Sequence, residues 1–150
     1  MSNTNNRPLS FLSNAETDRV SRALLAWLNE YPDKPVNISF EGLRPDTVGI
    51  ALSTIQGAYK TRQYITGGYE AQYQFKLIYR LQPTDSNDRL AADELLNAFG
   101  DWAAQRPDKP DIGIGRVLKI ACNTRSSLFA VYEDGSADHQ ILLTMTYEVI

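Results

Sequence analysis

The chain has 150 residues, of which 43% are hydrophobic and 22% are charged, and its formal net charge is −3. This length and composition are typical of one globular domain with its own core, and they exclude a largely disordered chain. The acidic balance argues against a protein whose main task is to grip nucleic-acid backbones. Cys122 is the only cysteine, which excludes an intrachain disulfide. The sequence shows no signal peptide and no membrane-spanning run, so we expect a protein made in the cytoplasm of its host, without membrane association.

The first part of the chain predicts an arm followed by a helix. Residues 1–14 are polar and rich in asparagine, and we expect them to form a flexible N-terminal arm before a single domain over residues 15–150. From Ala15 to Tyr31 the apolar residues recur at helical spacing, which predicts an amphipathic helix. Asn14 or Thr17 could cap its start. Pro32 ends the helix because the residue before a proline avoids the α region.

Three strands are expected next, over residues 36–42, 48–56 and 69–81. Apolar and polar residues alternate in the first and third of these segments, as in strands with one buried face. The second segment is apolar on both faces, which favours a more central strand. The third segment carries an aromatic stripe that includes Tyr73 and Phe75. We interpret this stripe as the packed face of a sheet and not as a surface on which nucleic-acid bases stack.

A second helix and three further strands complete the domain. Asp85 or Ser86 can cap a helix that runs to Gln105. Strands are then predicted over residues 116–123, 128–133 and 139–149, with a turn at Asp134-Gly135 between the last two. The resulting order α-β-β-β-α-β-β-β predicts an α+β fold with two layers. In this fold two amphipathic helices cover one face of a mostly antiparallel sheet.

Few residues suggest catalytic chemistry. His139 is the only histidine, which excludes metal sites built on several histidines and leaves a serine triad through His139 as the sole nucleophilic arrangement of that kind. We interpret His139 as a surface or core-edge residue, so we expect no catalytic residue, no metal site and no cofactor.

Glu94 and Asp101 share a face of the second helix, roughly 10 Å apart along its axis. They could face a channel, or they could simply face solvent.

The segment between the second and third strands is the strongest candidate for a binding surface. "GAYKTRQYITGGY" is longer than the ~2 to 5 residues that a hairpin loop needs. The excess either extends both strands beyond the sheet as a ribbon or forms a recognition loop. Tyrosine and arginine are enriched at protein interfaces, which makes Tyr59, Lys60, Arg62 and Tyr64 candidate contacts to a neighbouring protein. A long solvated hairpin without a partner is the alternative.

Long stretches of the chain also resemble one protein family. The stretches are "GIALSTIQGAYKTRQYITGGYEAQYQFKLIYRL", "TDSNDRLAADELLNAFGDWA" and "TRSSLFAVYEDGSADHQILLTMTYEV", and the likeness spans most of residues 27–149. They are similar to the tail terminator proteins of tailed phages and prophages of Gram-positive hosts, which are also labelled minor capsid or head-tail joining proteins. The likeness rests on similar sequence and not on a catalytic signature.

The resemblance implies a structural virion protein and not an enzyme. Tail terminators form a homohexameric ring that caps the tail tube and joins it to the head connector. DNA passes through such a ring without specific binding, and the acidic balance of the chain suits that passage. The resemblance therefore places the protein in the virion, at the tail or the head-tail junction. A head-completion protein is the main alternative, and a small-ligand-binding or hydrolytic α+β domain is the alternative from a different functional class.

Overall fold

The computed structural model describes residues 10–43, 48–83 and 85–150. The predicted order α-β-β-β-α-β-β-β is confirmed, with one additional two-residue strand before the first helix. In chain order the elements are β1 (Ser10–Phe11), α1 (Asn14–Leu28), β2 (Ile38–Phe40), β3 (Gly49–Gln63), β4 (Tyr69–Leu81), α2 (Ser86–Gln105), β5 (Arg116–Cys122), β6 (Ser127–Val131) and β7 (Ala137–Val149).

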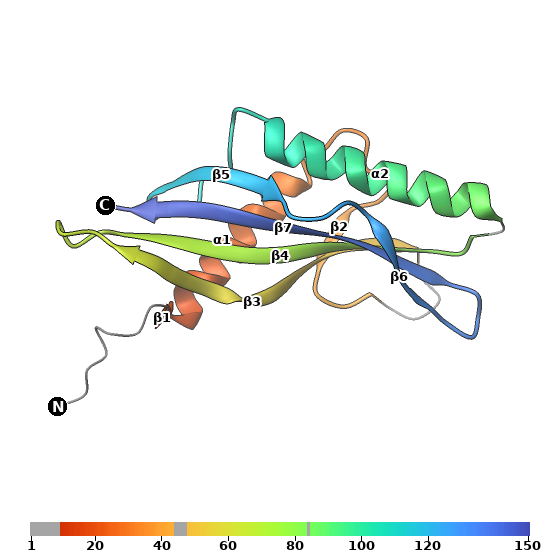
Figure 1. Ribbon diagram of the computed structural model, residues 1–150, viewed down its shortest axis with the longest axis horizontal. Coiled ribbons are helices and arrows are strands. Elements are labelled where there is room, and N and C mark those ends of the chain that lie inside the picture. The colour runs from red at the N-terminus through yellow and green to blue at the C-terminus, as the bar shows by residue number, and fades with distance from the viewer. Residues whose placement is uncertain (1–9, 44–47, 84) are drawn as a thin grey trace.

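The strands form one mixed sheet in which β4 and β7 are central (Figure 1). The order across the sheet is β1-β3-β4-β7-β5, and β2 pairs with β3 while β6 pairs with β7. The β2–β3 pair is parallel, and the other strand pairs are antiparallel. β4 and β7 are aligned over their full length, from the pair Tyr69–Val149 to the pair Leu81–Ala137, without a register shift.

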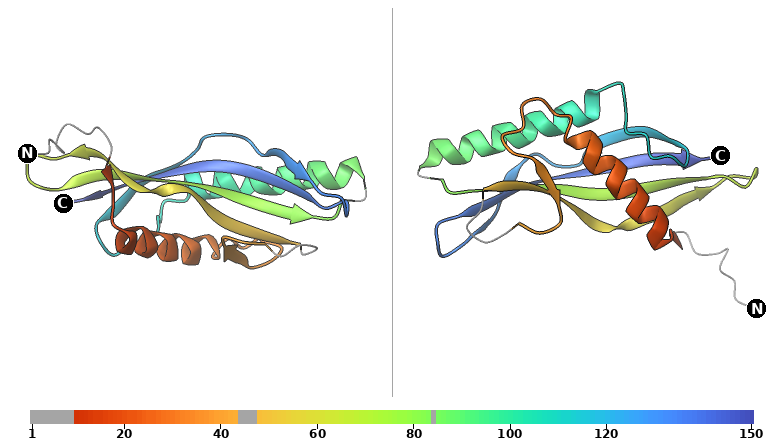
Figure 2. Two further views of the ribbon diagram at one scale, coloured as in Figure 1. Left: turned by 90° about the horizontal axis from the view of Figure 1, so that it is seen from below. Right: turned by 180° about the vertical axis from the view of Figure 1, so that it is seen from behind.

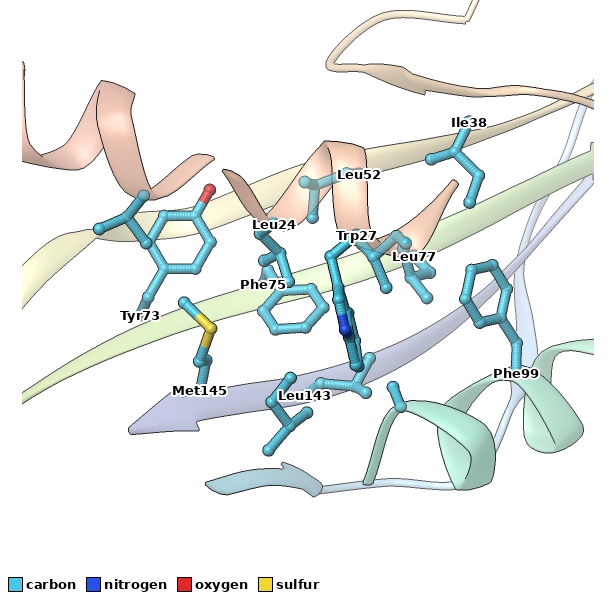
Figure 3. Packing of buried hydrophobic residues seen from close by; sticks show 14 of the residues in the cluster. Leu24, Trp27, Ile38, Leu52, Tyr73, Phe75, Leu77, Phe99, Leu143 and Met145 are labelled. Carbon is cyan, nitrogen blue, oxygen red and sulfur yellow. The ribbon is translucent and has the colours of Figure 1, made fainter. Parts of the chain in front are cut away.

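Both helices pack on the same face of this sheet (Figure 2), which confirms the predicted two-layer fold. α1 contacts β3 and β2, and α2 contacts β5, β7 and β4. The core lies between the layers. Figure 3 shows how large side chains from both helices meet those of the central strands, including Leu24, Trp27, Leu52, Tyr73, Phe75, Leu77, Phe99, Leu143 and Met145.

Regular secondary structure begins earlier in the chain than the sequence suggested. Ser13, and neither Asn14 nor Thr17, caps α1, because its side chain accepts a hydrogen bond from the backbone N–H of Glu16. Within the predicted arm, residues 10–14 belong to β1, the cap and the start of α1. Residues 1–9 of that arm lie outside the described residues. The cap of α2 is Asp85, as predicted, and α2 ends at Gln105 as expected.

β3 is much longer than predicted. It continues seven residues beyond Gln56, to Gln63, so the segment expected to be a long connection is mostly strand. Register shifts between Thr54 and Gln56, between Gln56 and Tyr59, and between Lys60 and Arg62 explain the difference. Each β-bulge interrupts the alternation of inward and outward side chains by which a strand is recognised in a sequence. The segment is therefore a strand and not a recognition loop, and it lies within the sheet and not in a ribbon beyond it, because its partner β4 pairs with β7 from Tyr69 onward.

Candidate functional site

The β3–β4 hairpin ends in a tight turn at one end of the molecule. The turn occupies residues 64–68, where the N–H of Tyr64 donates to the carbonyl of Gly68 at 2.8 Å and that of Gly67 donates to Tyr64 at 3.1 Å. Gly67 has a φ of 97°, a conformation that favours glycine. Ile65 projects fully into solvent, with a relative exposure of 107%. We call residues 62–68 the hairpin tip.

The two tyrosines among the four predicted contact residues make hydrogen bonds to neighbouring strands of the same molecule. Tyr59 is buried, and its hydroxyl donates to Gln72 Oε1 at 2.9 Å and accepts from Gln74 Nε2 at 3.1 Å. Its ring lies edge-on to Phe11, with 6.4 Å between the centroids. The Tyr64 hydroxyl donates to Glu148 Oε2 at 3.0 Å. Both tyrosines therefore help to fix the hairpin to its own sheet.

The two predicted cations are more accessible. Lys60 Nζ donates to Gln63 Oε1 at 3.0 Å and lies 4.7 Å from the centre of the Tyr69 ring. Arg62 is 3.9 Å from Glu70, and 70% of its side chain is exposed. Arg62 is thus the predicted contact residue best placed to meet another molecule. Ile65 lies near Arg62 in the chain and was not among the predicted contact residues. The sequence did contain a signal for it, namely an apolar residue inside a glycine-containing turn.

Glu148 connects the tip to the far edge of the sheet. Its carboxylate accepts one hydrogen bond from the Tyr64 hydroxyl and a second, at 2.7 Å, from Nε of Arg116 in β5. The hydrogen bond from Arg116 and then that from Tyr64 lower the pKa of Glu148 below its usual range. The tip is therefore linked to β7 and β5 through hydrogen bonds to Glu148.

A second polar cluster holds the β5–β6 connection against α2. Asp93 Oδ1 lies 2.8 Å from His139 Nδ1, and it accepts a hydrogen bond from the Ser126 hydroxyl at 2.7 Å. His139 is only 1% exposed, and its Nε2 has no hydrogen-bond partner among the described residues. The carboxylate thus lies between serine and histidine. In a nucleophilic triad the histidine accepts the proton of the serine hydroxyl. Here the Ser126 hydroxyl is hydrogen-bonded to Asp93 and not to His139, so the histidine cannot act as its base.

The two acidic residues predicted to face a channel have different surroundings. Asp101 Oδ1 accepts a hydrogen bond from Arg125 Nη1 at 3.0 Å, which partly compensates its charge. One turn earlier, Asn97 Oδ1 accepts the backbone N–H of Ser126 at 2.7 Å. Glu94 is exposed. This face of α2 therefore anchors the β5–β6 connection through Asn97 and Asp101, while Glu94 faces outward.

The described residues contain no grouped metal ligands and no membrane-spanning helix. Among residues 10–43, 48–83 and 85–150, no group of three or more histidine, cysteine, aspartate or glutamate side chains is arranged to hold a metal ion. Neither helix in those ranges combines the length and the apolar character needed to cross a bilayer.

The comparisons with known proteins give a likeness of fold. No protein-family model matches the chain, and no curated protein matches it. A chain in the solved structure of the virion of a native gene transfer agent particle matches with a TM-score of 0.59 and 14% sequence identity. The match covers 86% of this chain and 97% of that chain. At this identity the two chains share a fold.

Proposed function

We propose that the protein is a structural virion component, namely a tail terminator that forms a homohexameric ring, caps the tail tube and joins it to the head connector. The observation that carries this proposal is the likeness of fold to a chain of a gene transfer agent virion, which extends over 97% of that chain. A fold alone does not fix a function. The resemblance of the sequence to tail terminators is the second, separate support.

The hairpin tip suits a contact with another virion protein. It combines the exposed arginine Arg62 with the fully exposed Ile65, and the exposed Ile150 at the C-terminus lies close by. A Cβ on Gly68 would meet the Val149 carbonyl oxygen and lie 2.9 Å from Ile150 Cα, so the end of the chain passes directly beside the turn. Arginine is enriched at protein interfaces, and exposed apolar side chains such as Ile65 are stabilised when a partner covers them. In this proposal the partner at the tip is the tail tube or the connector.

We further propose that the protein is not an enzyme. The Asp93, Ser126 and His139 cluster supports this view, because its hydrogen bonds leave the serine without a base. The alternative within structural proteins is a head-completion or minor capsid protein that docks on the portal side. The two structural roles differ in the partner that the tip would bind.

The ring is tested by the mass of the purified protein in solution and by negative-stain electron microscopy. We expect a particle with the mass of six chains and a ring with a central opening. A monomer at every concentration tested would contradict the proposal.

The tip is tested by a binding experiment with purified tail tubes. The variant Arg62→Ala/Ile65→Ser should still form rings and should lose binding to the tube ends. Leu90→Ser is a matched control, because Leu90 is also an exposed apolar residue but lies on α2. Rings of the Leu90 variant should bind tube ends as the unmodified protein does. Binding to head connectors and not to tubes would favour the head-completion alternative.

A further inference from the structure

β6 is an edge strand with apolar side chains on both of its faces. It pairs with β7, and the topology of the described residues places no strand on its other side. The segment from Leu128 to Tyr132 contains no charged residue and no proline. Its four large apolar side chains are between 41% and 53% exposed: Leu128, Phe129, Val131 and Tyr132.

This pattern is unusual for a strand that faces water. Native proteins protect edge strands with charged residues, prolines or bulges, because an open edge can pair with another chain. β6 has one such device, a bulge between Leu128 and Ala130. Phe129 lies at that bulge, and the Lys76 Nζ is 5.1 Å from the centre of its ring. Apolar residues on both faces are instead typical of a strand whose two faces are covered, and grouped exposed apolar side chains mark interaction sites, which indicates that β6 is covered in the assembled protein.

The opposite edge of the same sheet carries a complementary surface. There β2 pairs with β3, and Phe40 in β2 is exposed. Between α1 and β2 lies a groove of about 240 Å³, lined by Asp18, Ser21, Arg22, Leu25 and Phe40. This volume is below the ~300 to 1,000 Å³ of small-molecule pockets, and it suits a single large side chain. The groove presents two exposed charged residues, Arg22 and Asp18, and the exposed Glu133 that follows β6 can pair with the arginine.

We propose that β6 of one copy packs against the α1–β2 edge of the next copy, with Phe129 seated in the groove beside Phe40. This inference rests on the proposed ring and specifies the contact that builds it. The two surfaces lie on opposite edges of one sheet, so the contact joins different patches of identical chains. Such a heterologous contact repeats from copy to copy and closes into a ring when the rotation between copies allows. Each copy in the ring then has both of its apolar edges covered.

Two substitutions test the contact, one on each edge. Phe129→Asp places a charge on the β6 edge and leaves the groove edge intact, whereas Phe40→Asp does the reverse. We expect each variant alone to be a monomer by light scattering. An equimolar mixture should form heterodimers and nothing larger, because a single pair of intact edges remains. Dimer formation also demonstrates that both variants are folded. Phe40→Ser replaces Phe40→Asp if the latter does not fold, and Ile65→Asp is the control that should keep the ring.

The outcomes separate this inference from the proposed function. If the unmodified protein forms a ring and both variants keep it, the edge contact is wrong and the ring stands. Loss of the ring with Phe129→Asp alone would indicate that β6 pairs with something other than the groove edge, which also contradicts the inference. If the unmodified protein is a monomer at all concentrations, the ring itself is wrong, and the edge contact is wrong with it.

Discussion

Tyr147 and Glu16 are 131 residues apart in the chain, and the Tyr147 hydroxyl donates a 2.8 Å hydrogen bond to the Glu16 carboxylate. The Tyr69 hydroxyl donates to the other oxygen of the same carboxylate at 2.6 Å. One side chain in the first turn of α1 therefore ties the helix to the two central strands, β4 and β7. Tyr147 is fully buried and Glu16 is half-buried, so this contact lies at the edge of the core.

We expect Tyr147→Phe to lower the free energy of unfolding by about 1.5 to 3 kcal/mol, because it removes a partly buried hydrogen bond to a charged acceptor. Urea denaturation followed by tryptophan fluorescence measures the change. Tyr79→Phe is the matched control, since burial raises the pKa of Tyr79 without a contribution from a carboxylate. An equal loss in both variants would show that the contact with Glu16 adds nothing beyond the burial of a hydroxyl.

The same cluster predicts a loss of stability at alkaline pH. Burial, and then the hydrogen bond to Glu16, raise the pKa of both Tyr69 and Tyr147 well above the ordinary tyrosine value of about 10. The folded state therefore keeps protons that the unfolded chain releases. This contribution to stability is complete below about pH 10 and is lost as the pH rises toward the folded values. Urea midpoints at pH 8 and above pH 10 should show the loss, and it should be smaller in Tyr147→Phe.

A buried ion pair predicts the opposite dependence at acidic pH. Arg80 donates to both carboxylate oxygens of Asp138, at 2.7 and 2.8 Å, and Tyr132 donates to Asp138 as well. Burial alone would raise the pKa of Asp138, but the hydrogen bonds from Arg80 and Tyr132 hold it below its usual range. The pair's contribution to stability is present above the ordinary aspartate value of about 4 and is lost as the pH falls through the folded value.

We therefore expect Arg80→Met to cost about 3 to 5 kcal/mol near neutral pH, because it leaves a buried carboxylate without its cation. The difference from the unmodified protein should shrink as the pH falls, beginning above about pH 4, because burial without Arg80 raises the pKa of Asp138 in the variant and this carboxyl then takes up a proton. Urea denaturation at a series of pH values provides the measurement. A difference that does not change with pH would show that the loss comes from packing and not from charge.

Trp102 lies at the contact between the two helices. Its ring centroid is 4.7 Å from that of Trp27 and 5.1 Å from that of Tyr31, and the Arg106 guanidinium lies 5.0 Å from it on the solvent side. We expect Trp102→Ala to cost roughly 3 to 5 kcal/mol in chemical denaturation. A nearly neutral effect would mean that the helices do not stabilise each other. Arg106→Gln, which keeps the rings, should cost much less.

The acidic face of α2 gives a prediction about DNA. If Glu94 and Asp101 face the opening of the ring, reversing both charges to lysine should slow the passage of DNA, because two cations would then attract phosphate. Asp101→Lys also repels Arg125, so the variant is compared with one that adds Arg125→Glu and restores the pair. Delayed DNA release from assembled particles in both variants would support a channel position. Unchanged infectivity would place these residues outside the channel.

The sequence predicted the order of elements well because the pattern of apolar residues survives in the helices and in β4 and β7. It failed where the backbone is irregular, since the bulges of β3 shift the alternation near Ile55 and Tyr59. The candidate contact residues were chosen by residue type, and residue type does not reveal that Tyr59 and Tyr64 are bonded to Gln72 and Glu148. Contacts across 13 and 84 residues depend on strand register, which the local pattern does not specify.

The unbroken β4–β7 ladder has a mechanical consequence. Its pairs run from the hairpin tip to the opposite end of the molecule (Figure 1), and antiparallel hydrogen bonds lie perpendicular to the strands. A pull along the strands, applied at the tip, loads these bonds together in shear, whereas a pull across the sheet would open them one after another. The same domain should therefore resist a much larger force along its long axis than across it, a difference that single-molecule stretching from two pairs of attachment points would measure.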